Sequence, residues 1–148
     1  MIGGVFMYSF AFKDLSSADL ISGAIYESNG GGFANEPLHE LFKVDSLGGV
    51  GTQGGIRRAM LANKKIEDEA YIVLVNTHSI DEWKNTYNPT SKILTYFGDN
   101  RIPGKDIFDT KQRGNLTFKK IFDRGYGSQK EREKLPPIFY FERTGARR

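Results

Sequence analysis

The sequence contains no cysteine, so disulfide bonds, thiolate metal sites and a cysteine nucleophile are all excluded. Its two histidines, His39 and His78, stand far apart and outside any ligand-spaced cluster, which argues against a metal site. No apolar run is long enough to cross a membrane, and residues 1–12 lack the basic flank and small-residue cleavage site of a signal peptide. We therefore expect a cytoplasmic protein with no membrane partner, no metal and no other cofactor.

Length and charge set two further bounds. The 148 residues suffice for one domain with its own core, so we expect residues 1–148 to form a single domain. The 21 lysines and arginines against 18 aspartates and glutamates give a net charge of +3 and an isoelectric point of about 9.1. This basic balance favours a polyanionic partner such as a nucleic acid.

Apolar periodicity predicts the elements of the first two thirds of the chain. Alternating aromatic residues predict a strand over residues 6–12, and helical spacing of the next apolar residues predicts a helix between Ser17 and Asn29. A short second helix is expected to begin at Pro37. The β-branched run at residues 70–75 predicts a buried strand, which we expect to form a hairpin with a strand over residues 92–97.

Turn and capping residues organise the remainder. Residues 88–91, with the sequence NPTS, predict a turn, and Asn115 is expected to cap a helix that ends before Gly125. The buried face of that helix would consist of Phe118, Ile121 and Phe122. Residues 129–134 predict a charged, solvated loop, and residues 138–141 a final strand.

The most glycine-dense stretch, residues 48–55, precedes Arg57 and Arg58. It lacks both the G-x-x-x-x-G-K-[ST] spacing and a strand to G-x-G-x-x-G to helix context, so a nucleoside triphosphate site is not expected. Its glycines would let a nucleic-acid backbone approach closely, because they carry no side chain to clash. An ordinary surface loop fits the same residues, and both interpretations stay open.

A nuclease is the main functional alternative. A PD-(D/E)xK site needs an acid on one strand and an E-x-K phrase on the next, to hold magnesium and activate water. The nearest phrase here is Glu142-Arg143-Thr144, which lacks the lysine. We therefore expect no catalytic residues, and keep a PD-(D/E)xK-like nuclease domain and a protein-interaction module as alternatives.

Several longer phrases follow one another in a specific order. Residues 53–58 read QGGIRR, residues 70–75 read AYIVLV, and DEW follows at residues 81–83. Residues 96–104 read YFGDNRIPG, and residues 110–115 supply a threonine and then Gly-Asn. This order resembles the N-terminal recognition domain of AspBHI/MspJI-type modification-dependent restriction endonucleases, in which a phrase close to Y-Y-G-D-N-x-x-P-G follows a strand. The TYFG phrase that begins at Thr95 also resembles SRA domains.

The resemblance implies a fold and a function. The fold would be α+β, an SRA-like (PUA-like) bent β-sheet or partial β-barrel with two or three flanking helices. The domain would bind double-stranded DNA, rotate a modified cytosine such as 5-methylcytosine out of the stack, and hold it in a pocket. Because a separate nuclease domain follows in the family, residues 1–148 are expected to be a truncated, non-catalytic recognition domain with a C-terminal nuclease domain in the full-length protein.

The resemblance also implies roles for individual residues. The pocket would use the ring of Tyr96 and the carboxylate of Asp81 or Glu82, because a carboxylate accepts a hydrogen bond from the N4 amine of cytosine. Trp83 would be a second pocket ring or a core residue, and Tyr96 is alternatively core. The remaining contacts to DNA would come from polar and basic residues: Gln53, Arg57, Arg58, Asn100, Arg101, Lys105, Lys111 and Arg113.

Overall fold

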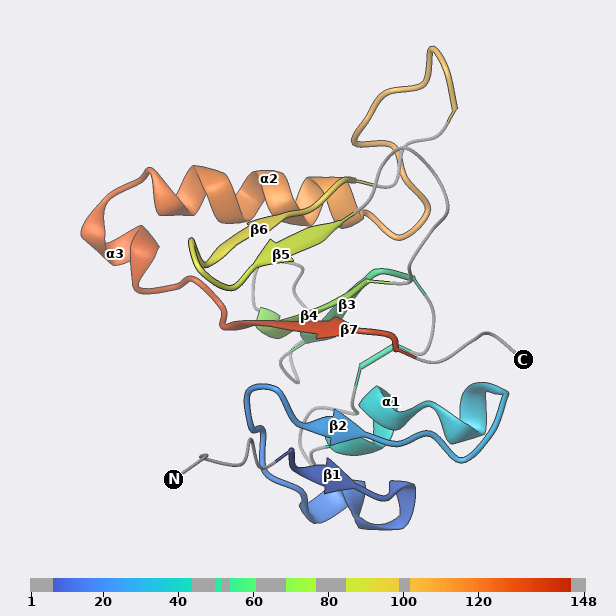
Figure 1. Cartoon of the computed structure of the whole chain (residues 1–148). Helices are drawn as coiled ribbons and strands as arrows, with labels where there is room; N and C mark the ends of the chain where they lie inside the picture. The colour runs from blue at the N-terminus through green and yellow to red at the C-terminus, as the bar shows by residue number, and fades with distance from the viewer. Residues whose placement is uncertain are drawn as a thin grey trace.

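The computed structural model describes residues 7–43, 50–51, 54–60, 69–76, 85–98 and 102–144. Their helices and strands stack in three layers, with a three-stranded sheet between an N-terminal layer and a layer made of helix α2 and a two-stranded hairpin (Figure 1). The architecture is α+β, as the sequence predicts. None of the helices in these segments is long and apolar enough to cross a bilayer.

The middle layer is a sheet in the order β3-β4-β7: β3 (Ile56–Met60), β4 (Glu69–Asn76) and β7 (Ile138–Glu142). β3 runs antiparallel to β4, and β7 runs parallel to it, with Ile72 of β4 opposite both Arg58 and Ile138. The strands predicted at residues 70–75 and 138–141 are therefore confirmed. A strand with a neighbour on each side and layers over both faces is buried throughout, which suits an unbroken β-branched run.

Alternate residues of β4 point to opposite sides of the sheet and support two clusters of apolar side chains. Tyr71, Val73 and Val75 face the N-terminal layer and pack with residues of α1. Ile72 and Leu74 face the other layer and pack with residues of α2 and the hairpin. None of these five side chains belongs to a residue more than 8% exposed. Full burial of one such side chain contributes about 1.5–3 kcal/mol to stability. Because β4 supplies buried side chains to both clusters, it joins the two halves of the core.

The N-terminal layer consists of short elements: β1 (Ser9–Phe10), η1 (Phe12–Ser17), β2 (Ile25–Tyr26), η2 (Phe33–Asn35) and α1 (Pro37–Leu41), where η denotes a 3-10 helix. The helix predicted to begin at Pro37 is confirmed, and it buries Leu38 and Phe42. The Tyr71 hydroxyl donates to the Phe42 carbonyl oxygen at 2.9 Å, and burial raises the pKa of Tyr71. This bond ties α1 to the central strand.

The strand predicted over residues 6–12 is shorter than expected. Within the described part of that range only Ser9 and Phe10 are extended, because Phe12 already begins η1. The Phe10 ring does pack as predicted for an apolar face, since it stacks on the Tyr26 ring at a centroid distance of 5.4 Å.

The helix predicted between Ser17 and Asn29 is wrong. Gly23 has a φ of +81°, a left-handed conformation that a right-handed helix does not contain. The Tyr26 hydroxyl then fixes the loop, because it accepts from the Ile21 amide at 2.8 Å and donates to the Asp19 carbonyl oxygen at 2.8 Å. The apolar residues whose spacing predicts one face of a helix therefore lie in a loop and in β2.

The third layer contains β5 (Thr86–Asn88), β6 (Ile93–Thr95), α2 (Gly114–Gly125) and α3 (Gln129–Arg132). The turn at residues 88–91 is confirmed, and the Asn88 side chain accepts from the amides of Thr90 and Ser91. The predicted hairpin between residues 70–75 and 92–97 is wrong, because β6 pairs with β5. β3 and β7 already occupy both edges of β4.

Helix α2 is confirmed with two corrections. The residue at its N-cap is Arg113 rather than Asn115, whose side-chain amide instead donates to the Ile107 carbonyl oxygen at 2.6 Å. Phe118 and Ile121 pack on the core, but Phe122 is 60% exposed. The apolar stripe of α2 is therefore narrower than its spacing predicts.

The predicted charged loop at residues 129–134 contains the one-turn helix α3 instead. Ser128 and Glu131 form a capping box, in which the Ser128 hydroxyl accepts from the Glu131 amide and the Glu131 carboxylate accepts from the Ser128 amide. The Ser128 amide holds the pKa of Glu131 below its usual value.

The central position of β4 predicts a large difference between two isoleucines. Ile72→Ala should lower the free energy of unfolding by about 2–5 kcal/mol, because Ile72 is 0% exposed between two layers. The matched control Ile93→Ala, at a residue 61% exposed on β6, should change it by no more than about 0.5 kcal/mol. Denaturant unfolding measures both values, and equal losses would contradict the burial of β4.

Candidate nucleic-acid interface

Five backbone positions from different parts of the chain meet at one edge of the molecule, where the parallel strands β4 and β7 end. The Gly55 carbonyl oxygen accepts from the Val75 amide at 2.7 Å, next to Asn76, and the Arg143 amide donates to the Asn76 carbonyl oxygen at 3.1 Å. The Asn76 side chain donates to the Asn85 carbonyl oxygen at 2.8 Å, and the Asn85 side chain accepts from the Phe97 amide at 2.8 Å. We call this region, defined by Gly55, Asn76, Asn85, Phe97 and Arg143, the carboxyl edge.

Tyr96 lies at the carboxyl edge and is half-buried. Its ring packs on Phe118 of α2 at a centroid distance of 5.3 Å and belongs to the cluster around Ile72 and Leu74. Its hydroxyl reaches the backbone of Gly55, where an added Cβ would collide with it. Tyr96 thus makes core contacts on one side, and its role toward a base remains a prediction.

Two further glycines at the edge allow close contacts with side chains from the segment before α2 and its first turn. Gly54 has a φ of +83°, and a Cβ there would collide with the Gln112 side chain. A Cβ at Gly98 would collide with the Asn115 side chain. These two glycines, one from the QGGIRR phrase and one from the YFGDNRIPG phrase, therefore both lie close to the start of α2, although some forty residues of sequence separate the two phrases.

The segment that leads into α2 presents basic side chains beside these glycines. Arg113 has a φ of +54°, which is uncommon for a residue with a side chain and is often found at functional sites. Lys111 and Arg113 are exposed, and within the described segments neither side chain has a hydrogen bond or ion pair. Lys105 is exposed too, but it pairs with Asp109 at 3.4 Å.

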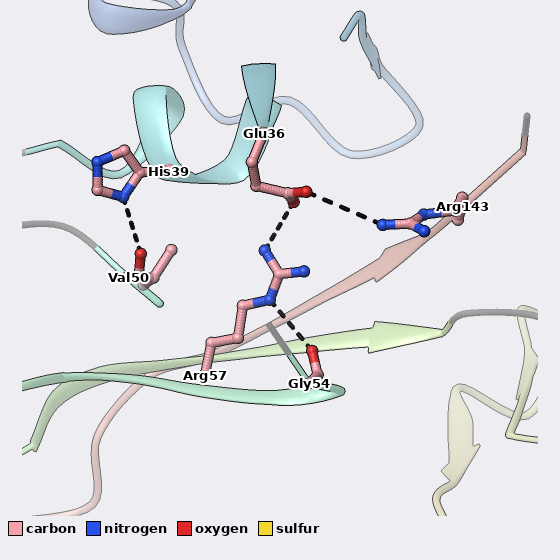
Figure 2. Close-up of polar contacts among 6 residues, drawn as sticks. All are labelled: Glu36, His39, Val50, Gly54, Arg57 and Arg143. Carbon is pink, nitrogen blue, oxygen red and sulfur yellow. Dashed lines mark hydrogen bonds and ion pairs between the residues drawn. The ribbon is translucent and has the colours of Figure 1, made fainter. Parts of the chain in front are cut away.

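Arg58 and Arg57 are neighbours on β3 with opposite surroundings. Arg58 is partly exposed and donates to the Gln112 carbonyl oxygen at 3.1 Å, which places it beside the basic segment. Arg57 is 3% exposed and lies on the other face of the sheet, where it pairs with Glu36 at 2.7 Å (Figure 2). The prediction that Arg57 contacts DNA does not fit this position, because a guanidinium that is buried and already paired cannot reach a phosphate.

The other predicted site residues lie outside the described residues: Gln53, Asp81, Glu82, Trp83, Asn100 and Arg101. In the sequence, each of these residues is next to or within a few positions of a described residue at the carboxyl edge. Gly54 follows Gln53, Asn85 follows residues 81–84, and Gly98 precedes residues 99–101.

The chain matches the family described as restriction endonuclease AspBHI N-terminal over residues 20–148. It belongs to that family. Two solved structures are similar to it over 93% of its length, each with a TM-score of 0.76. One is the DNA recognition domain of the cytosine modification-dependent restriction endonuclease LpnPI, at 34% identity, and the other is the DNA modification-dependent restriction endonuclease AspBHI, at 29% identity.

The resemblance inferred from the sequence is thus confirmed. The chain spans 56% of the LpnPI chain and 33% of the AspBHI chain, and the LpnPI structure is that of a DNA-recognition domain rather than of a nuclease. This agrees with a chain that is not itself catalytic. No curated protein sequence matches it significantly.

Sequence reasoning missed one polar group at the carboxyl edge of this family member. Asn76 is 6% exposed, and its side-chain amide also donates to the Tyr140 hydroxyl at 3.2 Å. That hydroxyl donates to Glu142 at 3.0 Å, and burial raises the pKa of Tyr140. The sequence does contain a signal for this group, because Asn76 directly follows the apolar run at residues 70–75. A polar side chain at the end of a buried strand needs hydrogen-bond partners.

The acids described do not form a metal site. No group of three or more metal-ligating side chains comes together in the described ranges, and Glu142 instead accepts from Tyr140. Arg143, at the x position of that E-x-K-like phrase, lies 3.9 Å from Glu36, and Thr144 stands where the phrase would have its lysine.

The contact between Gly55 and Tyr96 predicts a coupling that a double-mutant cycle can measure. Gly55→Ala should cost about 1–3 kcal/mol of stability, because its Cβ meets the Tyr96 hydroxyl. Tyr96→Phe removes that oxygen, so Gly55→Ala should cost less in the Tyr96→Phe background, with a coupling of about 0.5–3 kcal/mol. Gly51→Ala is the control, since no atom lies within 4 Å of its added Cβ. Strict additivity in denaturant unfolding would contradict the contact.

Proposed function

We propose that this chain binds double-stranded DNA through its carboxyl edge and recognises a modified cytosine, such as 5-methylcytosine, that it flips out of the duplex. In this proposal it is the specificity domain of a modification-dependent restriction endonuclease, whose nuclease domain belongs to a longer protein. The supporting observation is that the phrases shared with the family meet at one edge, where Gly55 touches Tyr96, Gly54 touches Gln112 and Gly98 touches Asn115.

The energetics of base flipping require the kind of groups that the proposal assigns to this edge. Extrusion of a base costs a few kcal/mol, and stacking on an aromatic ring returns about 1–3 kcal/mol. Tyr96 supplies the ring, and Asp81 or Glu82 the carboxylate that accepts from the cytosine amine. Asn85, three residues after Glu82 in the sequence, accepts from the amide of Phe97, next to Tyr96, and this contact supports the assignment of Tyr96 and one of the two acids to the same pocket.

The basic residues divide by their surroundings. Lys111 and Arg113 have no partner within the described segments, so they are the strongest candidates for phosphate contacts. Lys105 would first have to leave Asp109, and Arg58 is partly engaged by Gln112. Gln53, Asn100 and Arg101 follow or precede the glycines of the edge and complete the proposed interface.

The pocket is tested by comparing otherwise identical duplexes with modified and plain cytosine. Tyr96→Ala should weaken binding of the modified duplex by about 1–3 kcal/mol. Asp81→Asn or Glu82→Gln, whichever removes the reading carboxylate, should reduce the preference for the modified duplex more than the affinity, because phosphate contacts persist. Tyr126→Ala is the control, since Tyr126 is 89% exposed at the far end of α2.

Fluorescence anisotropy gives both affinities, and circular dichroism confirms that each variant is folded. If Tyr96→Ala, Asp81→Asn and Glu82→Gln all keep the wild-type preference, the pocket lies elsewhere. The same duplexes should stay intact when magnesium is added, and cutting that Glu142→Ala abolishes would support the nuclease alternative.

The phosphate contacts are tested by the salt dependence of binding. Lys111→Ala and Arg113→Ala should each weaken all duplexes alike and reduce the slope of log affinity against log salt by about one. Lys130→Ala is the matched control, because Lys130 is exposed on α3 at the opposite end of α2 (Figure 1). Unchanged slopes for both variants would remove the segment before α2 from the interface.

A further inference from the structure

A largely buried carboxylate joins three elements on the face of the sheet away from α2. Glu36 precedes α1, and its side chain is 12% exposed. One carboxylate oxygen pairs with Nη1 of Arg57 at 2.7 Å, and the other lies 3.9 Å from Nη2 of Arg143 (Figure 2). The Arg57 side chain is 2% exposed and the Arg143 side chain 35%, so Arg57 is the closer and more buried partner.

Burial of this ion pair calls for an explanation other than stability. Removing two charges from water is costly, and an apolar pair of similar volume is often as stabilising. A paired arginine does, however, have a fixed geometry, because its planar guanidinium carries several donors in one rigid fork. The role of Arg57 therefore depends on which groups its other donors bind.

A second donor of Arg57 holds the glycine turn of the carboxyl edge. Its Nε donates to the Gly54 carbonyl oxygen at 3.2 Å. Gly54 is left-handed and abuts the Gln112 side chain, and the next residue, Gly55, abuts the Tyr96 hydroxyl. The Gly55 carbonyl oxygen in turn accepts from the Val75 amide at 2.7 Å.

We infer that Glu36 and Arg57 are positioning residues, which set recognition by fixing the Gly54–Gly55 turn against Gln112 and Tyr96 without touching DNA. This inference rests on the proposed function, because it assigns the turn to the DNA-reading edge. The path is continuous: Glu36 orients Arg57, Arg57 fixes the Gly54 carbonyl, and the turn limits where the Tyr96 ring can lie.

Arg57→Lys separates the ion pair from the turn. The lysine ammonium can still pair with Glu36, but it lacks the fork that also reaches Gly54. The ratio of affinities for the modified over the plain duplex should fall roughly three- to tenfold. The salt slope should stay at the wild-type value, because lysine keeps the positive charge.

Two control variants bracket this result. Lys130→Ala removes an exposed lysine of α3 that bonds neither Glu36 nor Gly54, so it should leave both the ratio and the slope unchanged. Lys111→Ala should lower the salt slope by about one and leave the ratio unchanged. If Arg57→Lys instead weakens both duplexes by the same factor and leaves the ratio unchanged, Arg57 acts as a phosphate contact and the inference is overturned.

Hydrogen exchange on the free protein gives a readout that needs no DNA. In Arg57→Lys the Val75 amide, bonded to Gly55, should exchange faster, while the Ile72 amide, bonded to Pro137 at 3.0 Å, keeps its rate. Unchanged exchange at Val75 together with an unchanged ratio in the folded variant overturns the inference. If Arg57→Lys does not fold, Glu36→Gln takes its place, because a neutral amide holds Arg57 more weakly than the carboxylate does. The ratio should then fall and the Val75 amide should exchange faster, as expected for Arg57→Lys. A wild-type protein without preference for the modified duplex would refute the proposed function, whereas the exchange rates would still decide whether Arg57 fixes the turn.

Discussion

The structure depends on one strand that has neither a free edge nor a free face. β4 is paired with β3 on one side and β7 on the other, and its residues 71–75 are buried under both outer layers. Elements of both outer layers pack on it: α1 and Phe42 cover one face, and α2 with the β5–β6 hairpin covers the other. A chain of 148 residues is long enough to form such a core.

The buried, apolar run of β4 ends at a polar residue, Asn76. Asn76 continues the strand and remains buried, so its side-chain amide must be satisfied, and it is bonded to Asn85 and Tyr140. These bonds hold the start of β5 and the end of β7 beside the Gly54–Gly55 turn. One buried side chain therefore links the end of β4 to both β5 and β7.

Much of the fold could be predicted because its signals are local. The β-branched run of β4, Pro37 at the start of α1, and the NPTS turn each fix their own geometry. The failures concern long-range pairing. Which strand lies beside β4 depends on β7, more than sixty residues away, and the loop before β2 depends on a tyrosine hydroxyl that bonds back to Asp19 and Ile21. Helical spacing over residues 18–25 carries no information about either.

The same limit explains the two arginines of the QGGIRR phrase. Their charge and their sequence neighbourhood are identical, so the sequence assigns both to DNA. In a strand, however, consecutive side chains point to opposite faces, and only one of the two can face the segment before α2. Arg58 takes that side, and Arg57 is left on the face where Glu36 can neutralise it. The outcome was fixed by the alternation of β3 together with a single acid at the start of α1. A basic residue in a glycine-rich phrase of this family is therefore assigned to the nucleic acid only after its face of the strand is known.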